Sequence, residues 1–133
     1  MSDLPKKIGK YDVVDVLGKG SMGIVYRGHD EYVDRAVAIQ LATNTESGDE
    51  SAAVAKQMFF NEARSAGRLD HPNVLKVYEA GEEDGQPYMV MEYIAGGDTL
   101  RGYCQPDTLL PIPVVVSLIR QAADALDYAH ASG

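Results

Sequence analysis

The chain has 133 residues, of which 45% are hydrophobic and 24% charged, and 12 basic against 20 acidic residues give a net charge of −8. This is the length of one small domain and the composition of a globular protein. The negative charge argues against non-specific binding to nucleic acid or to an anionic membrane, because both need positive charge facing phosphate. Residues 1–28 nevertheless carry five cations and three anions, so phosphate chemistry is expected near the N-terminus.

The sequence shows no clear signal for export, membrane insertion or metal binding. Cys104 is the single cysteine, so no internal disulfide can form, which indicates a reducing compartment. The three histidines are far apart and lack paired ligands, so no metal site is expected. No apolar stretch approaches the ~20 residues of a membrane span, and the first residues lack the apolar segment of a secretion signal. We expect a cytoplasmic protein.

The first half of the chain changes from a strand pattern to a helix pattern. Within residues 11–42, apolar residues alternate with others in runs separated by glycine-rich or charged turns, which predicts three strands. Ser47 and Glu50 have the spacing of a capping box, which predicts a helix start. Apolar residues recur at helical spacing through residues 51–69, and the turn at residues 71–73 ends this helix.

Two strands and two helices are expected in the second half. Strands at residues 74–78 and 88–93 flank an acidic turn at residues 82–85, which predicts a hairpin. Asp98 is placed to cap a short helix. The last apolar residues keep a helical period, which predicts a long helix at residues 113–131.

The predicted fold class is α+β, with a five-stranded antiparallel sheet and one packed helix, followed by a short and a long helix. Gly96 and Gly97 interrupt the chain between the sheet and the last helices. We therefore expect two parts, at residues 1–95 and 96–133.

The most informative segment is Gly18–Lys19–Gly20–Ser21–Met22–Gly23. Its G-x-G-x-x-G pattern lets main-chain amides approach a polyphosphate, since no Cβ blocks them. Dinucleotide-binding folds share the pattern, but there the last glycine opens a helix, whereas here Ile24 and Val25 begin a strand signal. The dinucleotide interpretation is therefore disfavoured, and a glycine-rich hairpin without a ligand is the alternative.

Four further motifs follow this glycine loop. Val37–Ala38–Ile39–Gln40 lies on the third predicted strand, and Glu62 lies within the predicted helix. His71–Pro72–Asn73 forms the next turn, and Met91–Glu92–Tyr93 ends the last predicted strand. In this order and spacing the residues resemble the small lobe of a bacterial-type serine/threonine protein kinase, over roughly residues 8–133. Each motif alone is weak or moderate, and the combination is specific.

The resemblance implies an ATP site. In such kinases the glycine loop folds over the phosphates, apolar residues enclose the adenine, and the Glu92 carbonyl and Ile94 N–H would read its edge. Met91 matches the residue that controls the back pocket, and Asp98 matches a polar residue near the ribose. The implied ATP-binding residues are Leu17, Gly18, Lys19, Gly20, Ser21, Met22, Gly23, Val25, Ala38, Gln40, Met91, Glu92, Ile94 and Asp98. Core packing alone would also explain Val25, Ala38 and Met91.

Gln40 departs from the family. In the family a lysine at this position holds the phosphates and pairs with the helix glutamate, here Glu62. An amide supplies no positive charge, so Glu62 would face a triphosphate without a neutralising partner. We therefore expect weak ATP binding, if any. A natural pseudokinase feature and an introduced inactivating change both explain Gln40, and Glu62 has the alternative role of a solvated helix residue.

The family's catalytic base and magnesium ligands lie downstream of the segment that these residues resemble. Asp124 and Asp127 are the only late carboxylates, and they fit a solvated helix face better. We thus expect no catalytic residue and no magnesium site in these 133 residues, and a chain that is inert by itself.

The predicted helix at residues 113–131 carries an apolar stripe that the large lobe would cover in a complete kinase. An uncovered stripe of this size favours association, so we expect a homo-oligomer formed through this helix. The alternative is that the helix folds back on the sheet of its own chain. Two other functions remain open: a non-enzymatic, pseudokinase-like interaction or scaffold module, and binding of another phosphorylated ligand such as a cyclic nucleotide.

Overall fold

The computed structural model describes residues 4–21, 23–43, 48–96 and 99–133. The chain forms two compact units. The first comprises Met1–Arg68 and Leu75–Tyr93, and the second comprises Leu69–Val74 and Ile94–Gly133.

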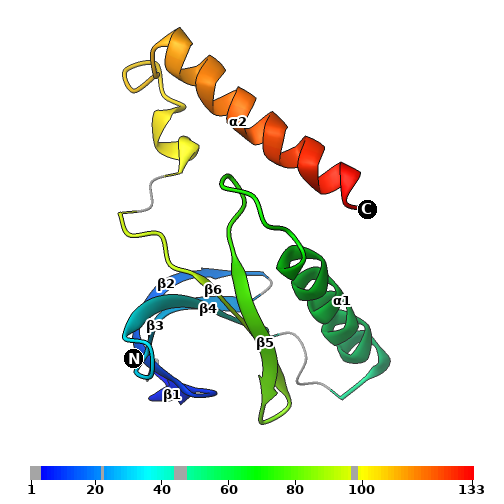
Figure 1. Cartoon of the computed structure of the whole chain (residues 1–133). Coiled ribbons are helices and arrows are strands. Elements are labelled where there is room, and N and C mark those ends of the chain that lie inside the picture. Colours follow the sequence, from blue (N-terminus) through cyan, green and yellow to red (C-terminus); the bar gives the residue numbers. More distant parts are fainter. Residues whose placement is uncertain (1–3, 22, 44–47, 97–98) are drawn as a thin grey trace. The chain divides into compact units, whose positions relative to one another are not determined.

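The first unit is built on an antiparallel sheet with strand order β1-β2-β3-β4-β6-β5 (Figure 1). Its strands are β1 (Lys7–Ile8), β2 (Tyr11–Gly20), β3 (Gly23–Asp30), β4 (Arg35–Leu41), β5 (Val77–Glu83) and β6 (Gln86–Glu92). The predicted α+β class and antiparallel sheet are confirmed. The predicted count of five strands is one too low for the described residues, because β1 has only two residues and cannot display an alternation.

The first strand of the last hairpin begins later than predicted, whereas its second strand begins earlier, at Gln86. The expected strand at residues 74–78 begins in fact at Val77, and Glu82 and Glu83 belong to β5 and not to the turn. The turn consists of Asp84 and Gly85, with φ values of 51° and 80°. An Asp-Gly pair with two positive φ angles makes a tight two-residue hairpin. This tight turn leaves the preceding acidic residues free to pair with β6.

Helix α1 (Glu50–Gly67) is capped by a residue that differs from the predicted one. The carboxylate of Asp49 accepts a hydrogen bond of 2.9 Å from the N–H of Ala52, which satisfies one of the free donors of the first turn. Ser47, the predicted cap, lies outside the described residues. The helix lies against β5 and β6 (Figure 1).

Two apolar cores lie on opposite faces of the sheet. Successive residues of β4 point to opposite faces, and Val37 and Ile39 belong to one core whereas Ala38 belongs to the other. The buried members of the first core are Ile8, Tyr11, Tyr26, Val37, Ile39 and Val90. Those of the second, to which α1 contributes, are Ala38, Ala42, Phe59, Ala63, Met89 and Met91. The alternation therefore places Gln40 on the α1 side of the sheet.

Side chains join the two edges of the curled sheet. The hydroxyl of Tyr11 donates a hydrogen bond of 2.7 Å to Glu79 of β5. The N–H of Gly9, between β1 and β2, donates one of 3.0 Å to the carboxylate of Glu83. Burial, together with the hydrogen bond to Glu79, raises the pKa of the Tyr11 hydroxyl. We call this pair of contacts the seam.

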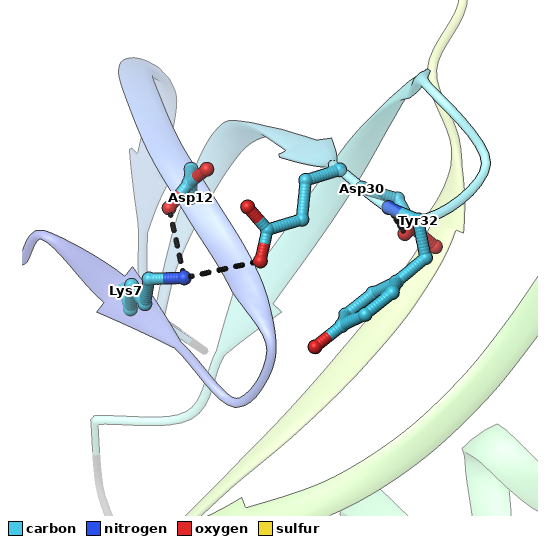
Figure 2. A network of polar contacts seen from close by, with 5 residues as sticks. Lys7, Asp12, Asp30 and Tyr32 are labelled. Atoms are coloured by element: carbon cyan, nitrogen blue, oxygen red, sulfur yellow. Dashed lines mark hydrogen bonds and ion pairs between the residues drawn. The ribbon is translucent and has the colours of Figure 1, made fainter.

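A polar network connects β1 with the turn between β3 and β4. Lys7 Nζ lies 3.2 Å from Asp12 and 3.7 Å from Glu31, and the hydrogen bond to Asp12 raises the pKa of Lys7 (Figure 2). Asp30 is buried, and its carboxylate accepts a hydrogen bond of 3.0 Å from the N–H of Tyr32 (Figure 2). These contacts fix the turn from which β4 starts.

The second unit contains the 3-10 helix η1 (Leu100–Tyr103) and helix α2 (Ile112–Ala131). The long final helix is therefore present at the predicted place, whereas the predicted cap Asp98 lies outside the described residues. Within this unit the N–H of Asp70 donates a hydrogen bond of 3.0 Å to the Tyr128 hydroxyl. In the described part of the chain, no helix has the length and apolar character needed to cross a membrane.

Candidate functional site

A cavity of about 370 Å³ opens at the end of the β2–β3 hairpin. The pairing of Gly18 with Val25, and of Val25 with Gln40, brings the glycine loop and β4 together. The cavity is lined by Gly18, Lys19, Gly20, Ser21, Gly23, Val25 and Gln40. Each of these residues is among those that the family resemblance implies for ATP binding, so half of the implied ATP-binding residues line one cavity.

The glycines of this loop differ in their surroundings. Gly23 has a φ of 142°, and a Cβ there would lie 2.0 Å from the carbonyl oxygen of Leu41. At Gly18 and Gly20 a Cβ would meet nothing within 4 Å. Gly23 is therefore needed for the close approach of β3 to β4, whereas Gly18 and Gly20 leave main chain open to the cavity. Because β3 starts at Gly23, no helix begins there, as predicted.

Gln40 is half-buried on β4, between Val25 of β3 and Met89 of β6. It is the polar residue that β4 contributes to the cavity. Lys19 is the only charged residue in the described lining, and no carboxylate belongs to that lining. The lining contains one cation, one hydroxyl and one amide side chain, at Lys19, Ser21 and Gln40, beside glycines whose main chain no side chain covers, which is a set of groups suited to an anion.

Glu62 does not line this cavity. It is exposed on α1 and forms no hydrogen bond or ion pair with any residue that the structure describes. Helix α1 buries Ala52, Phe59 and Ala63, and at 3.6 residues per turn Glu62 lies about a quarter-turn from that stripe. Among the described residues, groups of three or more Cys, His, Asp or Glu that could hold a metal ion are also lacking.

Of the residues implied for an adenine site, Val25 lines the cavity, whereas Leu17, Ala38, Met91 and Glu92 do not belong to the lining. Ala38 and Met91 are 7% and 9% exposed and belong to the core that α1 covers, so packing accounts for their types. Leu17 is exposed on β2. Glu92 ends β6, and its N–H donates a hydrogen bond of 2.8 Å to the carbonyl of Lys76.

The remaining implied residues lie elsewhere. Ile94 belongs to the second unit and is exposed, and Met22 and Asp98 lie outside the described residues. Before Ile94, Tyr93 closes the first unit, and the guanidinium of Arg27 lies 6.0 Å from its ring centroid.

Sequence reasoning missed a second cavity of about 350 Å³ between the end of α1 and the start of β5. Phe60, Ala63, Arg64, Gly67, Val77, Tyr78, Glu79 and Ala80 line it. No motif marks these residues, since each segment alone has only the pattern of an amphipathic element. The cavity follows from how α1 packs against an edge strand.

Comparisons with known proteins agree on one family. Residues 11–133 match the protein kinase domain. The chain is 39% identical over 127 residues to the serine/threonine-protein kinase PknE of Mycobacterium tuberculosis, a match that covers 96% of the chain and 22% of PknE. It is 36% identical over 122 residues to the serine/threonine-protein kinase PrkC of Bacillus subtilis, covering 92% of the chain and 18% of PrkC.

Among solved structures, the kinase domain of M. tuberculosis PknI matches with a TM-score of 0.79 and 30% identity, over 98% of this chain and 52% of that one. The chain thus spans about a fifth of the length of these curated relatives and about half of the PknI kinase domain.

Proposed function

This chain belongs to the protein kinase domain family, and on that premise we propose that its glycine-loop cavity binds the phosphates of ATP or of an ATP analogue. The observation that carries the proposal is the open main chain at Gly18 and Gly20, on the wall of a cavity that Gln40 also lines. Main-chain N–H groups that no side chain covers form an anion-binding concavity. The donor set therefore fits a polyphosphate.

We further propose that ATP binds weakly and that this chain alone transfers no phosphoryl group. Gln40 stands where the family has its phosphate-binding lysine. A neutral amide makes hydrogen bonds about half as strong as those of an ammonium. Phosphoryl transfer depends on electrostatic stabilisation of its transition state, so the loss of this charge affects the rate more than the binding. The described cavity lining also offers no carboxylate to a magnesium ion.

The test is a calorimetric titration of the chain with ATP and magnesium, compared with the variant Gln40→Lys. The added ammonium lines the same cavity, so the variant is expected to bind ATP about tenfold more tightly. Gln105→Lys is the matched control, because it adds the same charge in the second unit and should leave the affinity unchanged. If millimolar ATP neither releases heat nor raises the melting temperature of either protein, nucleotide binding is refuted.

A second candidate function is that of an interaction module that self-associates through helix α2. The observation that favours it is an apolar stripe on α2 that is exposed at Ile112, Ile119 and Leu126, by 79%, 64% and 58%. Large apolar side chains at helical spacing mark an interface when they remain in water. Light scattering at high protein concentration separates the two candidates, since a strict monomer contradicts the second and leaves the first intact.

A further inference from the structure

Helix α1 turns one stripe of side chains toward the sheet, and one member of this stripe is charged. Ala52, Phe59 and Ala63 are buried along it. Lys56 comes four residues after Ala52 and three before Phe59, so it shares their face of the helix. Its side chain is 34% exposed, so about two-thirds of it is covered.

The Lys56 ammonium meets a carboxylate of the sheet. Its Nζ lies 2.5 Å from Oε1 of Glu82 on β5. The other ion pairs among the described residues join Lys7, Lys10 or His29 to acidic residues within the β1–β4 region. As far as the described residues go, Lys56–Glu82 is thus the one ion pair that links α1 to the sheet.

In the family, a lysine at the position of Gln40 forms an ion pair with a glutamate at the position of Glu62. This chain cannot form that ion pair. Gln40 carries no charge. Glu62 is exposed, and it has no ion-pair partner among the described residues. Among the described residues, the charged contact between α1 and the sheet is therefore the one with β5.

We propose that the Lys56–Glu82 ion pair sets the position of α1 on the sheet in this chain, and that Lys56 is a positioning residue. Neither partner lines the glycine-loop cavity. In a chain with a lysine at position 40, by contrast, one ammonium would bind the phosphates and also pair with the glutamate of α1.

Hydrogen exchange of the full chain, followed by mass spectrometry, tests this proposal. Lys56→Met keeps the stem and removes the charge, and Glu82→Gln removes the partner charge with little change of shape. Each variant should accelerate amide exchange in Glu50–Gly67 by about two- to fivefold, the size of effect expected for a half-exposed pair, while β2, β3 and β4 keep their exchange rates. Arg64→Met is the control, because Arg64 lies on the same helix and has no ion-pair partner among the described residues.

The charge-swapped variant, Lys56→Glu with Glu82→Lys, should bring the exchange of α1 back toward the unmodified rate. The proposal is overturned if Lys56→Met exchanges like the unmodified chain, if Arg64→Met accelerates α1 equally, or if all strands accelerate together with the helix. The measurement uses no nucleotide. A negative result therefore leaves the proposed ATP binding untouched, and a failure of ATP binding leaves this result standing.

Discussion

Gly20 and Gly23 belong to one motif but have different physical roles. At Gly23 the positive φ and the nearby Leu41 carbonyl leave no room for a side chain. At Gly20 there is open space, so its missing Cβ matters for a ligand and not for the fold. The motif itself could be predicted because its residues are contiguous. The distinction between the two glycines could not, because it depends on a carbonyl that strand pairing brings close.

We expect Gly23→Ala to lower the free energy of unfolding by about 2–3 kcal/mol, through backbone strain and the clash with Leu41. Gly20→Ala should change it by less than about 0.5 kcal/mol while still weakening ATP binding. Urea denaturation of both variants provides the measurement. Equal stabilities of the two variants would contradict the assignment of roles.

At the scale of elements, the seam is where a titratable group contributes to stability. Burial raises the pKa of the Tyr11 hydroxyl, and burial likewise raises the pKa of Tyr88. A folded-state pKa above the unfolded value, which is about 10 for tyrosine, means that folding favours the protonated hydroxyl. This stabilisation is complete below about pH 10 and is lost as the pH rises through the raised pKa of the folded chain.

Tyr11→Phe should therefore reduce stability by about 1 kcal/mol at pH 7, the usual contribution of one hydrogen bond. Above pH 10 the variant should lose stability less steeply than the unmodified chain, because Tyr11 no longer contributes to the slope while Tyr88 and Lys7, whose pKa values are also raised, still do. Tyr32→Phe is the control, since that side chain is 75% exposed. Thermal melts from pH 7 to 11 measure both effects, and identical slopes for Tyr11→Phe and Tyr32→Phe would refute the role of the seam.

The sequence predicts well those elements whose hydrophobic pattern extends over enough residues to identify a helix or a strand. Strand β3 buries Tyr26, Gly28 and Asp30 on one face, and β4 buries Val37, Ala38 and Ile39 on its two faces, so both runs are long enough to predict a strand. The start of β5 could not be predicted from the sequence. Lys76 accepts a hydrogen bond from the N–H of Glu92 just before the strand begins at Val77, and local sequence does not show a contact between residues so far apart. The position of Gln40 beside the glycine loop followed only from the family resemblance, since strand pairing determines it.

At the scale of the whole molecule, the two units differ in how their apolar residues are covered. The first unit buries apolar side chains on both faces of its sheet. Helix α2 of the second unit buries only Ala125. Its exposed residues Ile112, Ile119 and Leu126 recur every seven positions, an alignment on which the proposed self-association depends.

If α2 mediates self-association, Ile119→Asp should convert an oligomer to a monomer, since a carboxylate in an apolar interface is costly to desolvate. Ser117→Asp adds the same charge at an exposed position about 160° away around the helix and should leave the oligomer intact. Light scattering over a concentration series measures the difference. Equal masses for both variants at all concentrations would argue that the stripe is not the contact surface.

The seam also has a consequence for how the chain acquires its fold. Its two hydrogen bonds connect residues 68 and 74 positions apart, so the N-terminal turn cannot reach its partners on a ribosome until β5 has emerged. Contacts so distant along the chain form late, because loop closure costs entropy before the contact is gained. The β2–β3–β4 meander, whose pairings are local, is then the part that can assemble first, with closure of the curled sheet as the concluding step.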